Sequence, residues 1–159
     1  MSVNLSNSCI LLIESASSIR AALRNALVSA GALVLEVDTL EAARDHLSMV
    51  RPTSVLLDLG LPDGDGLELM DLIGADVPVA ALAHDMSEHT LFRCHQAGCQ
   101  SVIIKGRRML NLSNTMAQLE AAVRRASWRT DAQPALAAHG ATHLPPNALI
   151  WAQNFGERL

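Results

Sequence analysis

Three charged side chains stand at the ends of apolar runs that are short enough to be buried strands. Glu14 and Lys105 each follow such a run directly, and Asp58 closes another. In an open parallel sheet, ligands bind outside the carboxyl ends of the strands, at the point where the strand order reverses. If the first, third and fifth strands are neighbours, these three side chains converge on one pocket.

Such a trio would suit a phosphoryl group. Two carboxylates held close together repel each other, and a divalent cation with a nearby ammonium relieves that repulsion. A carboxylate-bound Mg²⁺ neutralises phosphoryl oxygens, Lys105 adds a point charge, and one carboxylate acts as the acceptor nucleophile. Asp58 is the better nucleophile candidate, because it ends the most hydrophobic strand and burial fixes its position. Singly, a strand-end Asp more often caps a turn and a strand-end Lys is more often solvated, but the three together favour a site.

The elements that must position this trio alternate between strand and helix five times. Continuous apolar runs predict the strands, and apolar residues at helical spacing predict the helices. The predicted strands span 9–13, 33–37, 54–58, 78–82 and 101–104, and the predicted helices span 17–30, 40–50, 67–74, 88–97 and 111–128. This pattern predicts a doubly wound (βα)5 α/β fold, a flavodoxin-like three-layer sandwich around a five-stranded parallel sheet.

The chain of 159 residues suits one domain with a tail. We expect a flexible N-terminus over residues 1–8, the domain over 9–128, and a linker with a C-terminal tail over 129–159. Within the tail, 147–159 could form a short helix. That helix would dock on the domain, bind a partner, or be the stub of something longer, with docking the first choice.

Composition excludes several classes of function. No apolar run approaches the ~20 residues of a membrane span, and the first residues lack a secretory signal, so we expect a cytoplasmic protein. The net charge is −4 with scattered basic residues, which argues against direct nucleic-acid binding. Three cysteines without a C-x-x-C pair suit reduced, buried or half-buried thiols. The histidines, including His84, His89 and His95, are expected at surface or capping positions rather than at a metal.

Three segments resemble the receiver domains of bacterial response regulators. Val55-Leu-Leu-Asp58, running into Leu59-Gly-Leu-Pro-Asp-Gly-Asp-Gly66, is similar to the phosphoacceptor strand and its following loop. Ile10-Leu-Leu-Ile-Glu14, with Arg20 in the next helix, looks like the first strand of that family. Ala97-Gly98 followed by Val102-Ile-Ile-Lys105 looks like the fifth. The resemblance covers residues 9 to 127 with its spacing intact.

The resemblance implies a phosphoacceptor in a two-component phosphorelay rather than an enzyme. A sensor histidine kinase or a histidine phosphotransfer protein would pass a phosphoryl group to Asp58 with Mg²⁺ bound. Glu14, Asp58 and the Gly60 carbonyl would hold the metal, and Lys105 would face the phosphoryl group. Output would pass through protein contacts, with a homodimer or a partner on the face formed by the fourth helix, fifth strand and fifth helix.

Four positions depart from the family pattern. Ser15 replaces one acid of the metal-binding pair, which lowers the negative charge of the site and weakens Mg²⁺ binding. Ala83 stands where Ser or Thr would bond a phosphoryl oxygen, and Val102 stands where an aromatic ring would switch. Gly106 replaces the proline after Lys105, so a cis bond there would cost ~2.5–4 kcal/mol and we expect a rearranged loop. These changes predict an atypical receiver.

Two other functions are compatible with the sequence. One is a pseudo-receiver that serves as a phosphorylation-independent protein-interaction module. The other is an aspartyl-nucleophile phosphatase, which we disfavour because Gly60 stands where that class needs a second acid. Nucleotide binding is disfavoured as well, since no glycine-rich phosphate-binding motif follows any strand.

Overall fold

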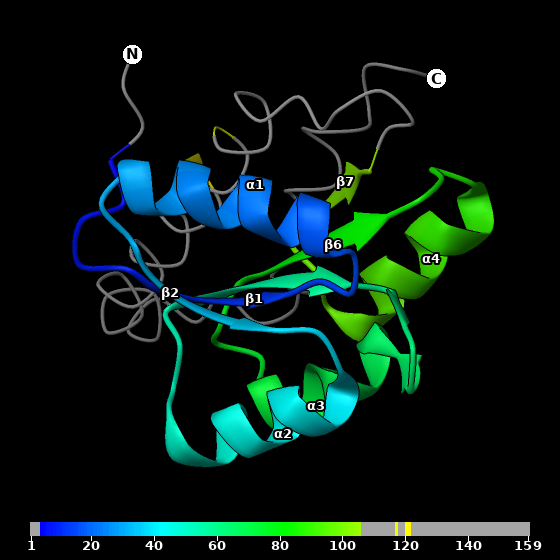
Figure 1. Ribbon diagram of the computed structural model, residues 1–159. Helices are drawn as coiled ribbons and strands as arrows, with labels where there is room; N and C mark the ends of the chain where they lie inside the picture. The colour runs from blue at the N-terminus through cyan, green and yellow to red at the C-terminus, as the bar shows by residue number, and fades with distance from the viewer. Residues whose placement is uncertain (1–3, 106–116, 118–119, 122–159) are drawn as a thin grey trace, which may run out of the picture.

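The computed structural model describes residues 4–105, 117 and 120–121 (Figure 1). Along the chain the strands and helices are β1 (Cys9–Ile13), α1 (Ser17–Ser29), β2 (Leu33–Val37), α2 (Leu40–Met49), β3 (Ser54–Asp58), β4 (Gly60–Leu61), β5 (Gly64–Asp65), a 3-10 helix η1 (Gly66–Leu69), α3 (Met70–Ile73), β6 (Val79–Ala83), α4 (Glu88–Ala97) and β7 (Ser101–Ile104).

The main sheet has five parallel strands in the order β2-β1-β3-β6-β7. This is the doubly wound, flavodoxin-like order, and the predicted fold class is confirmed. Helix α1 covers one face of the sheet, and α2, α3 and α4 cover the other (Figure 1). The order changes direction at β1 and β3, so the ends of these two strands form the edge where a ligand site is expected.

Apolar side chains alternate between the two faces of the sheet and build a core on each side. On the α1 face, Leu23 and Leu27 of the helix pack with Leu12 and Leu56 of the strands. On the opposite face a larger cluster joins the sheet to α2, α3 and α4. All five residues of β3 are buried, which explains why its sequence is a continuous apolar run ending in one acid.

The structure differs from the predicted elements mainly in the segment after β3. The predicted turn contains a two-stranded antiparallel hairpin, β4–β5, and the predicted helix over 67–74 is a 3-10 turn leading into the four-residue α3. The strand predicted over 78–82 is instead Val79–Ala83, because Pro78 has no N–H to donate to the ladder.

The predicted helix over 111–128 lies mostly outside the described residues, although Ala117, Glu120 and Ala121 are helical. Gly106, the predicted linker and the tail lie wholly outside them. Within the described part of the chain, no helix is long and apolar enough to cross a membrane.

Candidate functional site

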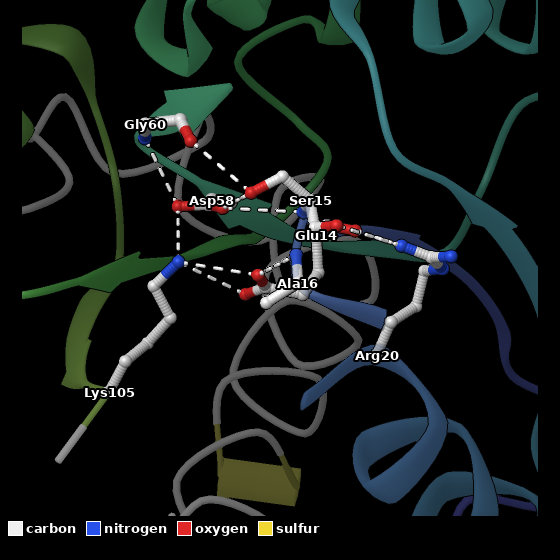
Figure 2. Close-up of polar contacts among 7 residues, drawn as sticks. All are labelled: Glu14, Ser15, Ala16, Arg20, Asp58, Gly60 and Lys105. Carbon is white, nitrogen blue, oxygen red and sulfur yellow. Dashed lines mark hydrogen bonds and ion pairs between the residues drawn. The ribbon is translucent and has the colours of Figure 1, made fainter. Parts of the chain in front are cut away.

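Glu14, Asp58 and Lys105 meet at the carboxyl edge of the sheet, although they come from distant parts of the sequence (Figure 2). The Lys105 Nζ lies 2.6 Å from Asp58 Oδ1 and 3.2 Å from Glu14 Oε2. Both carboxylates are fully buried and Lys105 is 6% exposed. One buried ammonium therefore faces two buried carboxylates, which leaves the trio with a net negative charge.

Asp58 is held by donors on both of its oxygens. Oδ1 accepts the Gly60 N–H at 3.1 Å in addition to Lys105, and Oδ2 accepts the Ser15 hydroxyl at 3.0 Å. Burial alone would raise the pKa of Asp58, but the bonds from Lys105, Gly60 and Ser15 outweigh it and lower that pKa below its ordinary value. Asp58 is therefore an ionised, fixed carboxylate of the kind that nucleophilic attack requires.

Glu14 is the less satisfied carboxylate of the pair. Its Oε1 accepts the Ala16 N–H at 2.9 Å, whereas Oε2 is buried with no hydrogen-bond partner and contacts Lys105 only as an ion pair. Burial, with the nearby Asp58 charge, raises the pKa of Glu14 above its ordinary value. Glu14 is the group in this site that gains most from another cation.

The oxygens of the site suit a small, hard cation. The Ser15 hydroxyl lies 3.0 Å from Asp58 Oδ2 and 3.4 Å from the Gly60 carbonyl oxygen, so these two oxygens face one common point (Figure 2). The Glu14 carboxylate, which shares the Lys105 ammonium with Asp58, adds a second carboxylate to this edge of the site. Mg²⁺ binds such sets of oxygens while keeping several of its waters. The residues present therefore fit Mg²⁺, with Ser15 supplying a neutral oxygen where a further carboxylate would add charge.

Arg20 fixes the loop that carries Glu14 and Ser15. From the first turn of α1, its Nη1 donates to the Glu14 carbonyl at 2.7 Å and to the Ser15 carbonyl at 3.3 Å. Charged donors make stronger hydrogen bonds than neutral ones. The sequence marks Arg20 only through the family resemblance, whereas its bonds to these two carbonyls show how it positions the loop.

Gly66 is a positioning residue that sequence reasoning missed. A Cβ added there would lie 2.1 Å from the carbonyl oxygen of Asp58, closer than any real contact. The Gly66 N–H donates to the Leu59 carbonyl at 3.0 Å, which folds the loop back onto the end of β3. The sequence shows that the loop is rich in glycine, but it does not show which of these glycines must lack a side chain.

The two acids of the glycine-rich loop have structural partners. Asp63 accepts the N–H groups of Leu40 and Glu41 at the start of α2, at 2.8 and 3.0 Å. Asp65 caps η1 and forms an ion pair with Arg93. These contacts pin the loop on both sides, and neither acid joins the candidate site.

Of the four positions that depart from the family pattern, three can be placed. Ser15 contacts Asp58 directly, as described above. Ala83 ends β6 with a buried methyl group, and its carbonyl accepts the Lys105 N–H at 2.7 Å. Val102 is buried in the larger core cluster. Gly106 lies outside the described residues.

The remaining candidate ligands form no second site in the part of the chain that is described. Among those residues no group of three or more His, Cys, Asp or Glu could hold a metal ion. His84 and His89 are exposed, and His95 is half-buried in the last turn of α4. The three cysteines are free thiols, Cys9 half-buried and the other two buried.

Comparison with known proteins gives consistent results. Residues 10–117 match the family model described as the response regulator receiver domain. The chain is 34% identical, over 127 residues, to the KDP operon transcriptional regulatory protein KdpE of Escherichia coli (strain K12). That match covers 79% of this chain and 55% of KdpE, so the chain spans about half the length of this relative.

Solved structures of low sequence identity share the fold. A two-component response regulator from Clostridium difficile has a TM-score of 0.68 at 21% identity, covering 75% of this chain and 98% of its own. A CheY-like receiver domain protein from Methanospirillum hungatei JF-1 has a TM-score of 0.71 at 17% identity, with coverages of 78% and 99%. The receiver domain of a sensor histidine kinase from Pseudomonas aeruginosa PAO1, which has magnesium coordinated in its active site cleft, has a TM-score of 0.65 at 23% identity, with coverages of 74% and 98%.

Proposed function

The chain belongs to the family of response regulator receiver domains, and from that premise we propose that it accepts a phosphoryl group on Asp58. Receiver domains of response regulators act in two-component signalling, and the chain is a member of that class. One observation above all supports the assignment of Asp58 as the acceptor. Asp58 is buried and ionised, with the Lys105 ammonium 2.6 Å from its Oδ1.

Phosphoryl transfer to Asp58 would follow from this arrangement. An Asp58 oxygen attacks phosphorus as the bond from phosphorus to the donor nitrogen or oxygen breaks, and the leaving group keeps that electron pair. The product is an acyl phosphate. The Lys105 ammonium, already between the two carboxylates, is placed to move toward a phosphoryl oxygen as the carboxylate charge is consumed.

Glu14, Asp58 and the Gly60 carbonyl would hold Mg²⁺. When bound, the metal supplies positive charge for the phosphoryl oxygens. Ser15 in place of an acid makes the site less negative, so we expect weaker binding than a three-carboxylate site would give. The raised pKa of Glu14 and its Oε2, which accepts no hydrogen bond and contacts only Lys105 as an ion pair, support a metal ligand role for this residue.

The physiological donor would be a sensor histidine kinase or a histidine phosphotransfer protein, in the cytoplasm. Output would pass through protein contacts, with a homodimer as one possibility to measure. We propose a receiver domain over residues 9–128, with 129–159 as a linker and tail. In this account the domain is a phosphoacceptor and not a phosphatase, since Gly60 offers a carbonyl and no acidic side chain.

The test is incubation of the full chain with a small phosphodonor such as acetyl phosphate and Mg²⁺, followed by intact-mass measurement. We expect a gain of one phosphoryl group that is lost in Asp58→Asn and in excess chelator. A folded wild-type chain with no mass gain would overturn the proposal and favour a phosphorylation-independent interaction module. Circular dichroism of wild type and Asp58→Asn shows whether both proteins are folded, so that misfolding is not mistaken for loss of the acceptor.

A further inference from the structure

Two of the three cysteines form a contact pair at the end of α4. Gly98 has a φ of 93° and ends the helix in the left-handed conformation. The Gly98 N–H donates to the His95 carbonyl and the Cys99 N–H donates to the Cys94 carbonyl, both at 3.0 Å. This pair of hydrogen bonds forms a Schellman motif, in which the side chains at the positions of Cys94 and Cys99 typically touch.

The backbone brings the two cysteines within range of a disulfide. A hydrogen bond of 3.0 Å from the Cys99 N–H to the Cys94 carbonyl keeps their Cα atoms within about 7 Å by standard bond lengths. That limit is the largest separation that a disulfide tolerates without backbone movement. Both thiols are fully buried in the same core cluster, which also contains Val102.

The two thiols also differ in their readiness to react. The interaction with Cys99 lowers the pKa of Cys94 below its ordinary value and outweighs burial, which acts in the opposite direction, while the charges of Arg93 and Asp65 oppose each other. The same interaction and burial raise the pKa of Cys99. Because the thiolate is the nucleophile in thiol–disulfide exchange, these two directions are consistent with Cys94 reacting first, an order that the Cys99→Ala variant tests.

We propose that Cys94 and Cys99 are a reversible oxidation site, at which a low-molecular-weight disulfide converts two thiols into an intramolecular disulfide. The Cys94 thiolate attacks one sulfur of the oxidant, forming a mixed disulfide and releasing one thiolate. Cys99 then gives up its proton and displaces the second thiolate, so the oxidant is reduced to two thiols. The product ties the last turn of α4 to the chain that enters β7.

Burial makes the reaction depend on local opening. Neither sulfur is exposed in the folded domain, so the oxidant reaches Cys94 only when the last turn of α4 opens. Cys9, half-buried on β1 and with no cysteine partner among the described residues, is the natural internal control. It can form a mixed disulfide but not an intramolecular one with Cys94 or Cys99 while the sheet is folded.

The test uses the full chain, oxidised glutathione as the probe, and tryptic mass mapping after blocking of free thiols. Trypsin places Cys94 and Cys99 together on the peptide 94–105 and Cys9 on the peptide 1–20. We expect the peptide 94–105 to carry no blocking group and to be about 2 Da lighter than the same peptide with two free thiols. A reductant should reverse this change. Cys9→Ala should leave that product unchanged, whereas Cys99→Ala should accumulate glutathione on Cys94.

Three results would overturn the proposal. One is recovery of both thiols of the peptide 94–105 in blocked, reduced form while Cys9 has reacted. Another is a disulfide that appears only at urea concentrations that unfold the domain. The third is linkage between two chains in place of the internal bond. The readout is mass alone, so it does not depend on phosphorylation of Asp58.

Discussion

The Lys105 Nζ lies 2.6 Å from Asp58 Oδ1 and 3.2 Å from Glu14 Oε2, with all three side chains buried. A buried charge is tolerated only when it is paired, so the stability of this corner of the sheet depends on the lysine. The same pairing keeps Asp58 ionised. The stability of this part of the sheet and the proposed reactivity of Asp58 therefore both depend on the contact between Lys105 and Asp58. Substitution of Lys105 tests both.

Replacing Lys105 with Met should lower the free energy of unfolding by about 3–5 kcal/mol at pH 7, because two buried carboxylates lose their counter-ion. The lowered pKa of Asp58 means that its stabilising contribution is present above its unfolded-state pKa and is lost as the pH falls through the folded value. The difference between Lys105→Met and wild type should therefore shrink in acid. Urea unfolding from pH 7 downward measures it.

The matched control for that experiment is the double variant Lys105→Met with Asp58→Asn. Removing one carboxylate charge relieves the repulsion that Lys105 had offset, so the double variant should be more stable than Lys105→Met alone at pH 7. Equal losses at neutral and acid pH, with no rescue by Asp58→Asn, would mean that Lys105 acts by packing alone.

Ser15→Asp should strengthen Mg²⁺ binding by about tenfold or more, which corresponds to about 1.4 kcal/mol. The Ser15 hydroxyl lies 3.0 Å from Asp58 Oδ2 and 3.4 Å from the Gly60 carbonyl, so a carboxylate there adds charge to the proposed metal oxygens. The added repulsion should destabilise the metal-free protein, and Mg²⁺ should restore it. Calorimetric titration and thermal unfolding with and without Mg²⁺ measure these effects.

Ser15→Ala is the control that distinguishes the effect of the added carboxylate from the effect of losing the hydroxyl. It removes the hydrogen bond to Asp58 without adding a charge. Its Mg²⁺ affinity should not rise. If Ser15→Asp binds Mg²⁺ no better than wild type, the proposed metal position between Asp58 and Gly60 is wrong.

Arg20→Met should lower the free energy of unfolding by about 1.5–3 kcal/mol, the usual value for hydrogen bonds to a charged group. It should also weaken Mg²⁺ binding, because the Glu14 and Ser15 carbonyls lose their common donor at 2.7 and 3.3 Å. Arg24→Met is the control from the same helix, because Arg24 pairs with Glu36 at 3.6 Å and donates to Asn25 Oδ1 at 3.3 Å, both at the exposed surface. A purely structural role for Arg20 predicts lower stability with unchanged Mg²⁺ affinity.

Gly66→Ala should destabilise the fold by about 3 kcal/mol or more, because the new methyl group cannot avoid the backbone at Asp58. Its Cβ would meet the Asp58 carbonyl oxygen at 2.1 Å, whereas a Cβ at Gly60 meets nothing within 4 Å. Gly60→Ala should therefore fold almost as stably as wild type. Similar unfolding curves for the two variants would contradict this placement of the loop.

The fold was predictable because the strands are buried on both faces and so appear as uninterrupted apolar runs, of which β3 is the clearest. The meeting of Glu14 and Asp58 followed from strand order, since β1 and β3 are neighbours and parallel strands end at the same edge. The expectation that the fifth strand is also a neighbour was wrong, because β6 lies between β3 and β7, and the long Lys105 side chain spans that gap to reach both carboxylates. The role of Gly66 was not predictable, because its need for a bare Cα comes from a contact with the Asp58 carbonyl across a folded loop. The β4–β5 hairpin was missed for a related reason: two-residue strands have no periodicity to detect.

The most direct test of the central claim is to locate the modification after reaction with acetyl phosphate and Mg²⁺. Borohydride reduces an aspartyl phosphate to homoserine, so peptide mass mapping of the reduced protein identifies the acceptor carboxylate. We predict homoserine at position 58 only, dependent on Mg²⁺. An unmodified Asp58 in folded protein, or homoserine at another position, would contradict the assignment of Asp58 as the phosphoacceptor.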